Sequence, residues 1–292
     1  MSLVKRKLSY GLFVAALVSV CLSGALSKAH AGIIPYSVIA PHEYQLPVGA
    51  DIPKDGINLL LSYNTFRDEG KAWDGESGAR SLFANVNKFA HIFKIDGLDK
   101  AGFLWEGVLG FGSLQLKNNT SETGMIDGQT GLVGWYNPIP NMSLVLEYWL
   151  YLPIGSDNLS GHSWDHSFAF MFNYHTGGFT FDGDFGYKLK GDYKDGGMQL
   201  EQGNVFFANT VFAYKFMNQI EPFFKVDFQT TETGKDKATG DKTSGQAELA
   251  LGIGNQFKIS DRLNLALWYE AGVTGRNTTK TNAGYARFIW SF

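Results

Sequence analysis

The sequence predicts an all-β protein, a transmembrane antiparallel up-and-down β-barrel of about 12 strands. Three observations predict this fold. From Gly56 onward apolar and polar residues alternate in segments, the connections between these segments are short and long in turn, and the chain closes on the aromatic strand that ends at Phe292. Alternation with a period of two indicates β-strands, because successive side chains of a strand point to opposite faces.

The predicted strands are of similar length and fill most of the chain. They are expected near residues 57–67, 81–95, 102–116, 127–137, 142–153, 164–174, 179–190, 203–216, 221–231, 244–257, 262–273 and 282–292. The short connections are predicted at residues 96–101, 138–141, 175–178, 217–220 and 258–261, and the long ones at 68–80, 117–126, 154–163, 191–202, 232–243 and 274–281. Short periplasmic turns that alternate with longer extracellular loops are typical of bacterial transmembrane barrels.

A soluble sheet also alternates, so aromatic placement and strand length decide between the two environments. Strands that cross a membrane at a tilt need roughly 9–11 residues, and a closed barrel leaves no unpaired strand edge in lipid. Aromatic residues recur near the predicted strand ends, as two interfacial girdles require: Tyr63, Phe66, Trp135, Tyr136, Tyr174, Tyr214, Phe216, Phe257, Tyr285 and Phe292.

One strand, 81–95, does not keep a single parity. Ala84 and Val86 oppose two asparagines, whereas further along Phe89 and Phe93 share the opposite parity. A β-bulge near Lys88 would restore the alternation. The inward face of this strand is therefore not assigned from the sequence.

The N-terminus predicts export. Lys5, Arg6 and Lys7 precede an apolar run, and a cleavage site after Ala31 completes a secretory signal peptide over residues 1–31. The alternative, a lipoprotein acylated at Cys21, is disfavoured because Val20 is too large for the position before the cysteine. The strand 282–292 resembles the C-terminal signal that the outer-membrane barrel assembly machinery reads, which places the protein in the bacterial outer membrane with that machinery as a partner.

Residues 32–55 precede the barrel, which is expected over 56–292. Four prolines (Pro35, Pro41, Pro47 and Pro53) exclude a regular strand or helix here. The segment is either a disordered periplasmic tail or an ordered plug in the lumen, and its apolar content favours the plug.

The inward parity predicts a lumen that is both charged and aromatic. With a net charge of −3, nothing indicates nucleic acid as a partner. The charges form either a structural network that fills the barrel or, together with nearby aromatic rings, a path for a small solute. The candidate lumen residues are Glu106, Glu147, Trp149, Tyr151, Asp182, Asp184, Lys225, Asp227, Glu248, Trp268, Glu270 and Arg287. Glycines on the same parity leave room at the wall or permit curvature: Gly110, Gly112, Gly186, Gly252, Gly254 and Gly272.

No catalytic or metal site is predicted, and no cofactor. The stretch from His162 to His166 could offer two histidines and Asp165 to a metal, but a surface loop of this kind ordinarily ligates nothing. A hydrolase would need Ser163 and His166 with a third polar residue on the same face, and none is found.

Two short motifs resemble a known family. Leu150–Asp157 reads Leu-Tyr-Leu-Pro-Ile-Gly-Ser-Asp, and Gly128–Leu132 reads Gly-Gln-Thr-Gly-Leu. Both are similar to elements of the outer-membrane transporter family labelled for the meta pathway of phenol degradation, although Ile154 replaces the usual threonine. The resemblance implies a twelve-stranded monomeric channel for small, often aromatic or hydrophobic compounds, and no enzyme.

The sequence thus predicts a channel for passive uptake of small hydrophobic or aromatic molecules, in contact with outer-membrane lipid. The alternative is a structural or adhesion barrel with a sealed lumen and loops that bind partners.

Overall fold

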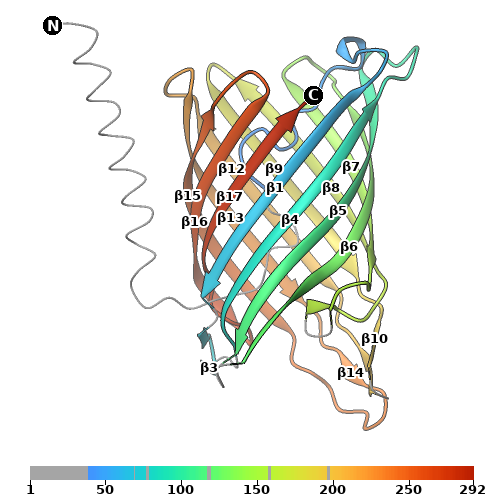
Figure 1. The fold of residues 1–292 in the computed structure, drawn as a ribbon, viewed down its shortest axis with the longest axis vertical. Coiled ribbons are helices and arrows are strands. Elements are labelled where there is room, and N and C mark those ends of the chain that lie inside the picture. Colours follow the sequence, from blue (N-terminus) through green and yellow to red (C-terminus); the bar gives the residue numbers. More distant parts are fainter. Residues whose placement is uncertain (1–38, 69, 77–78, 117–119, 157–158, 196–197) are drawn as a thin grey trace, which may run out of the picture.

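The computed structural model describes residues 39–292 except 69, 77–78, 117–119, 157–158 and 196–197. Twelve antiparallel strands form one closed barrel in the described chain, as predicted (Figure 1). Their bounds are β1 Ile57–Asp68, β4 Ala79–Phe93, β5 Ala101–Leu116, β6 Ser121–Tyr136, β7 Met142–Leu152, β8 Asp165–Thr176, β9 Phe179–Leu189, β12 Val205–Tyr214, β13 Ile220–Thr231, β15 Gln246–Lys258, β16 Leu263–Arg276 and β17 Asn282–Ser291. Short strands outside the barrel are β2 Lys71–Ala72, β3 Gly75–Glu76, β10 Asp192–Asp195, β11 Met198–Glu201 and β14 Lys235–Asp236.

The barrel closes where the first strand pairs with the last. β1 and β17 pair without a break from Leu59↔Ser291 to Arg67↔Ala283. Closure pairs the backbone groups that an open sheet would leave exposed at its edges, which is the condition for crossing hydrocarbon with strands. None of the described residues form a helix that is long and apolar enough to span a membrane.

The predicted strict alternation of short and long connections is wrong at one place. β6 begins at Ser121, so residues 121–126 belong to a strand and not to the long connection predicted at 117–126. Its pairing with β5 is irregular between Val108 and Gly110, where Val108 faces Gln129 and Gly110 faces Ile126. A bulge of this kind changes the side-chain parity. The alternation of apolar and polar residues in the first part of β6 is therefore out of phase with the alternation in the second part.

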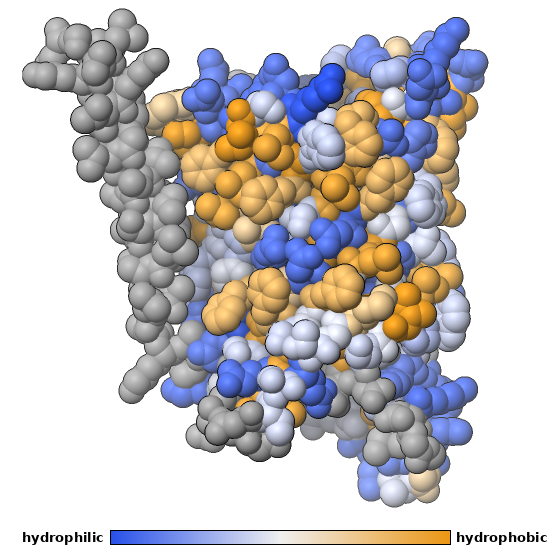
Figure 2. Space-filling model, in the orientation of Figure 1, coloured by the Kyte–Doolittle hydropathy of each residue, from blue (hydrophilic) through white to orange (hydrophobic). Residues whose placement is uncertain are grey.

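The outward face is apolar over two belts. Leu146, Phe168 and Phe212 are among the large hydrophobic side chains that stay exposed on the barrel wall. Figure 2 shows the opposite face, over β1, β4, β5 and β17, where orange residues gather above and below a blue patch, with hydrophilic residues at both ends of the barrel. Such a surface fits a bilayer core between two aqueous faces.

β4 keeps one parity throughout, so the predicted bulge near Lys88 is wrong. Its pairing with β1 runs unbroken from Ile57↔Ile92 to Asp68↔Ser81, and the irregularity lies instead between Ala79 and Ser81 in its pairing with β5. Lys88 therefore faces the lumen. The alternation looked broken because two asparagines of this strand occupy outward positions.

These asparagines form a polar patch between the two apolar belts, visible in blue in Figure 2. Asn85 Nδ2 donates to Ser62 Oγ (3.2 Å) and Asn64 Oδ1 (2.8 Å), and Asn87 Nδ2 donates to Asn85 Oδ1 (2.7 Å). Mutual hydrogen bonds lower the cost of placing amides on an apolar surface.

Three of the ten aromatic residues predicted for the girdles face the lumen instead. Tyr63, Trp135 and Tyr285 are 8%, 4% and 5% exposed. Each of them lies against an inner group: Tyr63 OH donates to Glu43 (2.6 Å), Trp135 Nε1 donates to the Pro47 carbonyl (2.9 Å), and Tyr285 stacks on Trp268. Position near a strand end was not enough to assign these rings, because parity decides the face.

Residues 39–55 contact the inner wall at the end of the barrel that carries the C-terminus (Figure 1). Ile39, Ala40 and Tyr44 are buried among inward side chains, and Lys94 Nζ donates to the Gly49 carbonyl (2.5 Å) beside the 3-10 turn Gly49–Asp51. The predicted signal peptide 1–31 and residues 32–38 lie outside the described residues.

Candidate functional site

A cavity of about 230 Å³ lies inside the barrel, between the wall and residues 39–44. Its lining combines rings, aliphatic groups and a few charges. The residues are Ile39, Glu43, Tyr44, Tyr63, Thr65, Ala84, Val86, Lys88, Val108, Ile126, Gln129, Glu147, Trp149, Tyr151, Ser167 and Phe207. Concave sites with apolar walls and a few convergent polar groups are the usual form of small-molecule sites.

Trp149 lies flat against the wall because β6 has a glycine opposite it. Gly131 pairs with Trp149 across the β6–β7 ladder, and a Cβ at Gly131 would approach the indole ring to 2.8 Å. Tyr151, two residues further along β7, carries Lys188 Nζ 3.3 Å from its ring centroid. The ring of Trp149 and that of Tyr151 therefore form one wall of the cavity.

Three ion pairs border the same cavity. Lys88 Nζ lies 3.1 Å from Glu106 Oε2 and 3.9 Å from Glu43 Oε1, and Arg287 pairs with Glu43. Burial favours the neutral form of Glu43, but the charges of Arg287 and Lys88 and the hydrogen bonds from Tyr63 and Arg287 together outweigh burial and lower the pKa of Glu43 below its ordinary value.

Glu147 is the remaining charged residue of the lining. It projects inward from β7 and is partly exposed to the cavity. Its charged neighbours are Glu106 and Lys88, yet among the described residues no basic nitrogen lies within 4.0 Å of its carboxylate.

Three other candidate residues hold residues 41–44 against the wall. Asp182 accepts hydrogen bonds from the backbone N–H groups of His42 (2.8 Å) and Tyr44 (3.2 Å). Asp184 accepts from Tyr44 OH (2.6 Å), and Arg287 donates to the Pro41 carbonyl (3.0 Å). These groups are already occupied by the chain itself.

His42 adds a further contact to this set. Its Nε2 lies 2.7 Å from Glu221 Oε2. Burial by itself would lower the pKa of His42, but the hydrogen bond and charge of Glu221, the charge of Asp182 and the hydrogen bond with Gln45 together outweigh burial and raise the pKa above 6.5.

A second cluster, separate from the cavity, gathers four more of the predicted residues. Lys225 Nζ lies 2.7 Å from Asp227 Oδ2 and 2.7 Å from Glu270 Oε1. Trp268 Nε1 also donates to Glu270 Oε1 (2.7 Å), and Trp268 is not part of the cavity lining. A fully buried cation between two carboxylates is a compact structural cluster.

Glu248 joins two long connections of the barrel by hydrogen bonds. Its carboxylate accepts from Trp73 Nε1 (3.1 Å), the Thr281 N–H (2.7 Å) and Thr281 Oγ1 (2.7 Å).

Of the predicted lumen residues, Glu147, Trp149 and Tyr151 line the cavity. Glu106 is not part of the lining but pairs with Lys88, which is.

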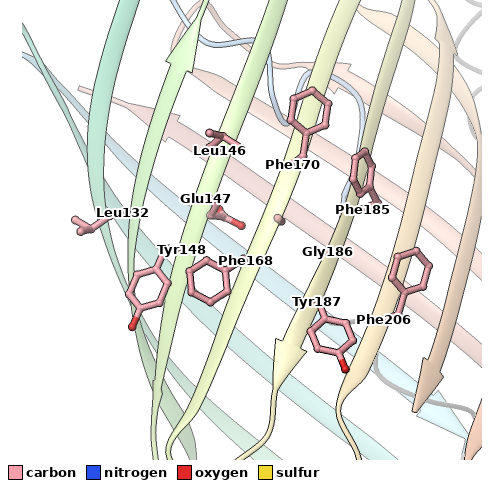
Figure 3. Close-up of a pocket in the computed structure, with 11 residues that line it drawn as sticks. Leu132, Leu146, Glu147, Tyr148, Phe168, Phe170, Phe185, Gly186, Tyr187 and Phe206 are labelled. Carbon is pink, nitrogen blue, oxygen red and sulfur yellow. The ribbon is translucent and has the colours of Figure 1, made fainter. Parts of the chain in front are cut away.

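A second depression, of about 460 Å³, lies on the outer wall. Figure 3 shows aromatic side chains of β8, β9 and β12, among them Phe168, Phe185 and Phe206, spread around Gly186. The ladders β7–β8 and β8–β9 are continuous here, from Met142↔Tyr174 to Tyr151↔Asp165 and from His166↔Leu189 to Thr176↔Phe179. The depression is thus a feature of the outer wall and not an opening through it.

The stretch His162–His166 does not assemble a catalytic pair. Ser163 Oγ donates to Asp165 Oδ1 (2.7 Å), whereas His166 Nδ1 lies 2.8 Å from Tyr148 OH. Asp165 also pairs with Lys188 (3.0 Å) and Lys190 (2.6 Å). Among the described residues no group of three or more His, Cys, Asp or Glu side chains could hold a metal ion.

Sequence reasoning missed several cavity residues. Lys88 is not among the predicted lumen residues because the parity of its strand is ambiguous in the sequence, and Tyr63 is predicted for a girdle. Glu43 and Tyr44 belong to a segment without periodicity, so no pattern could orient them. A single parity along the whole of β4 is the one feature of the sequence that predicts an inward position for Lys88.

The two motifs singled out in the sequence meet in space at this cavity. Gly128 pairs with Leu152 and Gly131 with Trp149, and Asp127 accepts from the N–H groups of Gly155 (2.9 Å) and Gly161 (2.7 Å) beyond the end of β7. A closed twelve-stranded barrel with a lumenal cavity of this kind defines the class: an outer-membrane-type, channel-like β-barrel.

The chain belongs to the family described as "Putative MetA-pathway of phenol degradation", which matches residues 45–288. No curated protein sequence matches it. In structure it is similar to the COG4313 outer membrane channel from Pseudomonas putida F1, with a TM-score of 0.73 and 14% identity over 87% of this chain and 100% of that chain. It is less similar to the translocator domain of the autotransporter NalP from Neisseria meningitidis, with a TM-score of 0.48 and 13% identity over 84% of this chain and 91% of that chain.

Proposed function

We propose that the protein is an outer-membrane channel for passive uptake of small hydrophobic or aromatic molecules, and that the lumenal cavity is its solute site. The observation that carries this proposal is the wall of Trp149 and Tyr151 beside a cavity of about 230 Å³. An apolar protein cavity of about 150 Å³ is enough to hold benzene. A single substituted ring therefore fits, and the stacked wall favours aromatic solutes.

In this proposal residues 39–55 narrow the lumen beneath the cavity. Contacts on several sides support this: Asp182 and Asp184 from β9, Arg287 from β17, and Trp135 from β6 all bind this segment. A solute would enter from the end with the long connections, bind at the Trp149 wall and pass when the segment yields.

The remaining sequence predictions complete the proposal. Export would use the signal peptide 1–31, and assembly would use the strand that ends at Phe292. The outer apolar belts would contact outer-membrane lipid, and the protein would act as a monomer without a cofactor and without catalysis.

Uptake by proteoliposomes tests the proposal. We expect the full mature chain to admit single-ring aromatic solutes with saturation, and Trp149→Ala to raise the half-saturating concentration several-fold because a stacking surface is lost. Trp290→Ala is the matched control, since Trp290 is 48% exposed on the outer face and should leave uptake unchanged.

Deletion of residues 39–50 distinguishes a channel from a structural or adhesion barrel with a sealed lumen. If the segment narrows the lumen, its deletion raises the single-channel conductance. The unheated deletion variant should still migrate in gel electrophoresis as a folded barrel. If neither the full chain nor a folded deletion variant passes any small solute, the channel proposal fails and the sealed structural or adhesion barrel remains.

A further inference from the structure

The charges around the cavity do not balance. Glu43 pairs with Arg287, and Lys88 with Glu106. Glu147 is left over, so this group of five charged side chains is one positive charge short when its carboxylates are ionised.

The unbalanced oxygens are directed to the cavity side of the wall. Glu147 lines the cavity and meets the side chains of Glu106 and Trp149. Glu106, which is 2% exposed, has an Oε1 atom with no hydrogen-bond partner among the described residues. A carboxylate taken out of water without a cationic partner is costly, so an ammonium group that enters the cavity gains more here than it would at the surface.

Aromatic rings surround the same point. Trp149 follows Glu147 by two positions on one face of β7, and Tyr44 lies close enough for the Glu147 charge to act on its hydroxyl. Lys88 Nζ already lies 5.9 Å from the Trp149 ring centroid and 6.0 Å from that of Tyr63. Rings beside a carboxylate are the arrangement by which proteins bind ammonium groups attached to apolar bodies.

Lys88 is not available to bind an anionic solute in the cavity. Its ammonium is engaged by Glu106 at 3.1 Å and approached by Glu43 at 3.9 Å. An aromatic carboxylate would have to displace one of these partners and would add a further negative charge beside Glu147.

Resting on the proposed function, we propose that the cavity selects organic ammonium ions, with Glu147 as the specificity-determining residue. The ammonium group of an arylalkylamine would bind Glu147, and its ring would lie on Trp149. A neutral alcohol of the same size would bind more weakly, and an acid would be rejected.

Three probes of matched size test this inference: 2-phenylethylamine, 2-phenylethanol and 3-phenylpropanoate. Binding to the purified full-length mature protein is followed by calorimetry, and entry by proteoliposome uptake. We expect the amine to bind about tenfold tighter than the alcohol, as a charge-assisted hydrogen bond predicts, and the acid not to bind measurably.

Glu147→Gln should remove the advantage of the amine while leaving the affinity for the alcohol unchanged. Glu201→Gln is the matched control, because Glu201 is exposed outside the barrel sheet. If the wild-type protein binds amine and alcohol equally, or prefers the acid, this inference is overturned while the channel survives. If calorimetry shows amine selectivity but no probe enters liposomes, the site stands and the channel proposal fails.

Discussion

At Gly252 the barrel wall has no room for a side chain. A Cβ at this position of β15 would lie 2.8 Å from Glu270 Cγ and 3.2 Å from Lys225 Cβ. Neither atom can move freely, because Lys225 and Glu270 are both fully buried and their charged ends are paired at 2.7 Å. The glycine is thus required by close packing around the buried ion pair.

We therefore expect Gly252→Ala to lower the free energy of unfolding by about 1–3 kcal/mol, the usual cost of overpacking a core. Urea unfolding in lipid vesicles, followed by tryptophan fluorescence, measures it. Gly284→Ala is the control: a Cβ there meets nothing within 4 Å, so the change should stay within about 0.5 kcal/mol. Equal effects of the two substitutions would refute the packing argument.

Parity along single strands predicts which face of the barrel a residue occupies. The inward positions of Arg287 and of Gly252 followed from alternation alone, because one residue decides the face of the next. The pairing of Arg287 with Glu43 could not be predicted in this way, since it joins two segments that lie far apart in sequence.

At the scale of elements, the segment 39–55 depends on a titratable contact. His42 is faced by Glu221 of β13 and Asp182 of β9, with His175 of β8 and Gln45 nearby. The pKa of His42 is raised because the contacts with Glu221, Asp182 and Gln45 together outweigh burial. Protonated His42 therefore binds the wall more strongly than neutral His42 does.

The sign of the pH effect follows from linkage. A raised pKa contributes docking free energy that is fully present below pH 6.5 and is lost as the pH rises through the raised pKa. We expect single-channel conductance to increase over that range as the segment is released, and His42→Gln to abolish the pH dependence. A conductance that falls with rising pH would contradict this assignment.

Strand boundaries are predictable from the sequence only where the alternation of apolar and polar residues is unbroken. Strands such as β9 and β15 were predicted almost to the residue because their alternation is unbroken. The start of β6 is not predicted because an irregular pairing changes its parity. β4 is predicted as a strand, but its inward face is not assigned because amides replace apolar residues on its outer face. The enclosed cavity itself could not be predicted, because Ile39, Glu43 and Tyr44 of its lining come from a segment without regular structure.

At the scale of the whole molecule, the inner wall carries more acid than base. The carboxylates of the described barrel strands that are buried or line the cavity are Glu106, Glu147, Asp165, Asp182, Asp184, Glu221, Asp227, Glu248 and Glu270. The corresponding cations are Arg67, Lys88, Lys188, Lys225 and Arg287. With all of these groups charged, the excess of carboxylates over cations would give the enclosed lumen a negative potential.

A negative lumen should conduct cations better than anions. In planar bilayers under a potassium chloride gradient, we expect a reversal potential of the sign that potassium permeation gives, because charged rings in a pore set its ion preference. Neutralising Glu147 by Glu147→Gln should move the reversal potential toward zero, whereas Asp261→Asn, in the exposed turn before β16, should not. The effect should also shrink at molar salt, where the screening length falls to about 3 Å. Chloride preference at low salt would show that the carboxylates of the inner wall do not govern the path, and would also remove the electrostatic basis for amine selectivity.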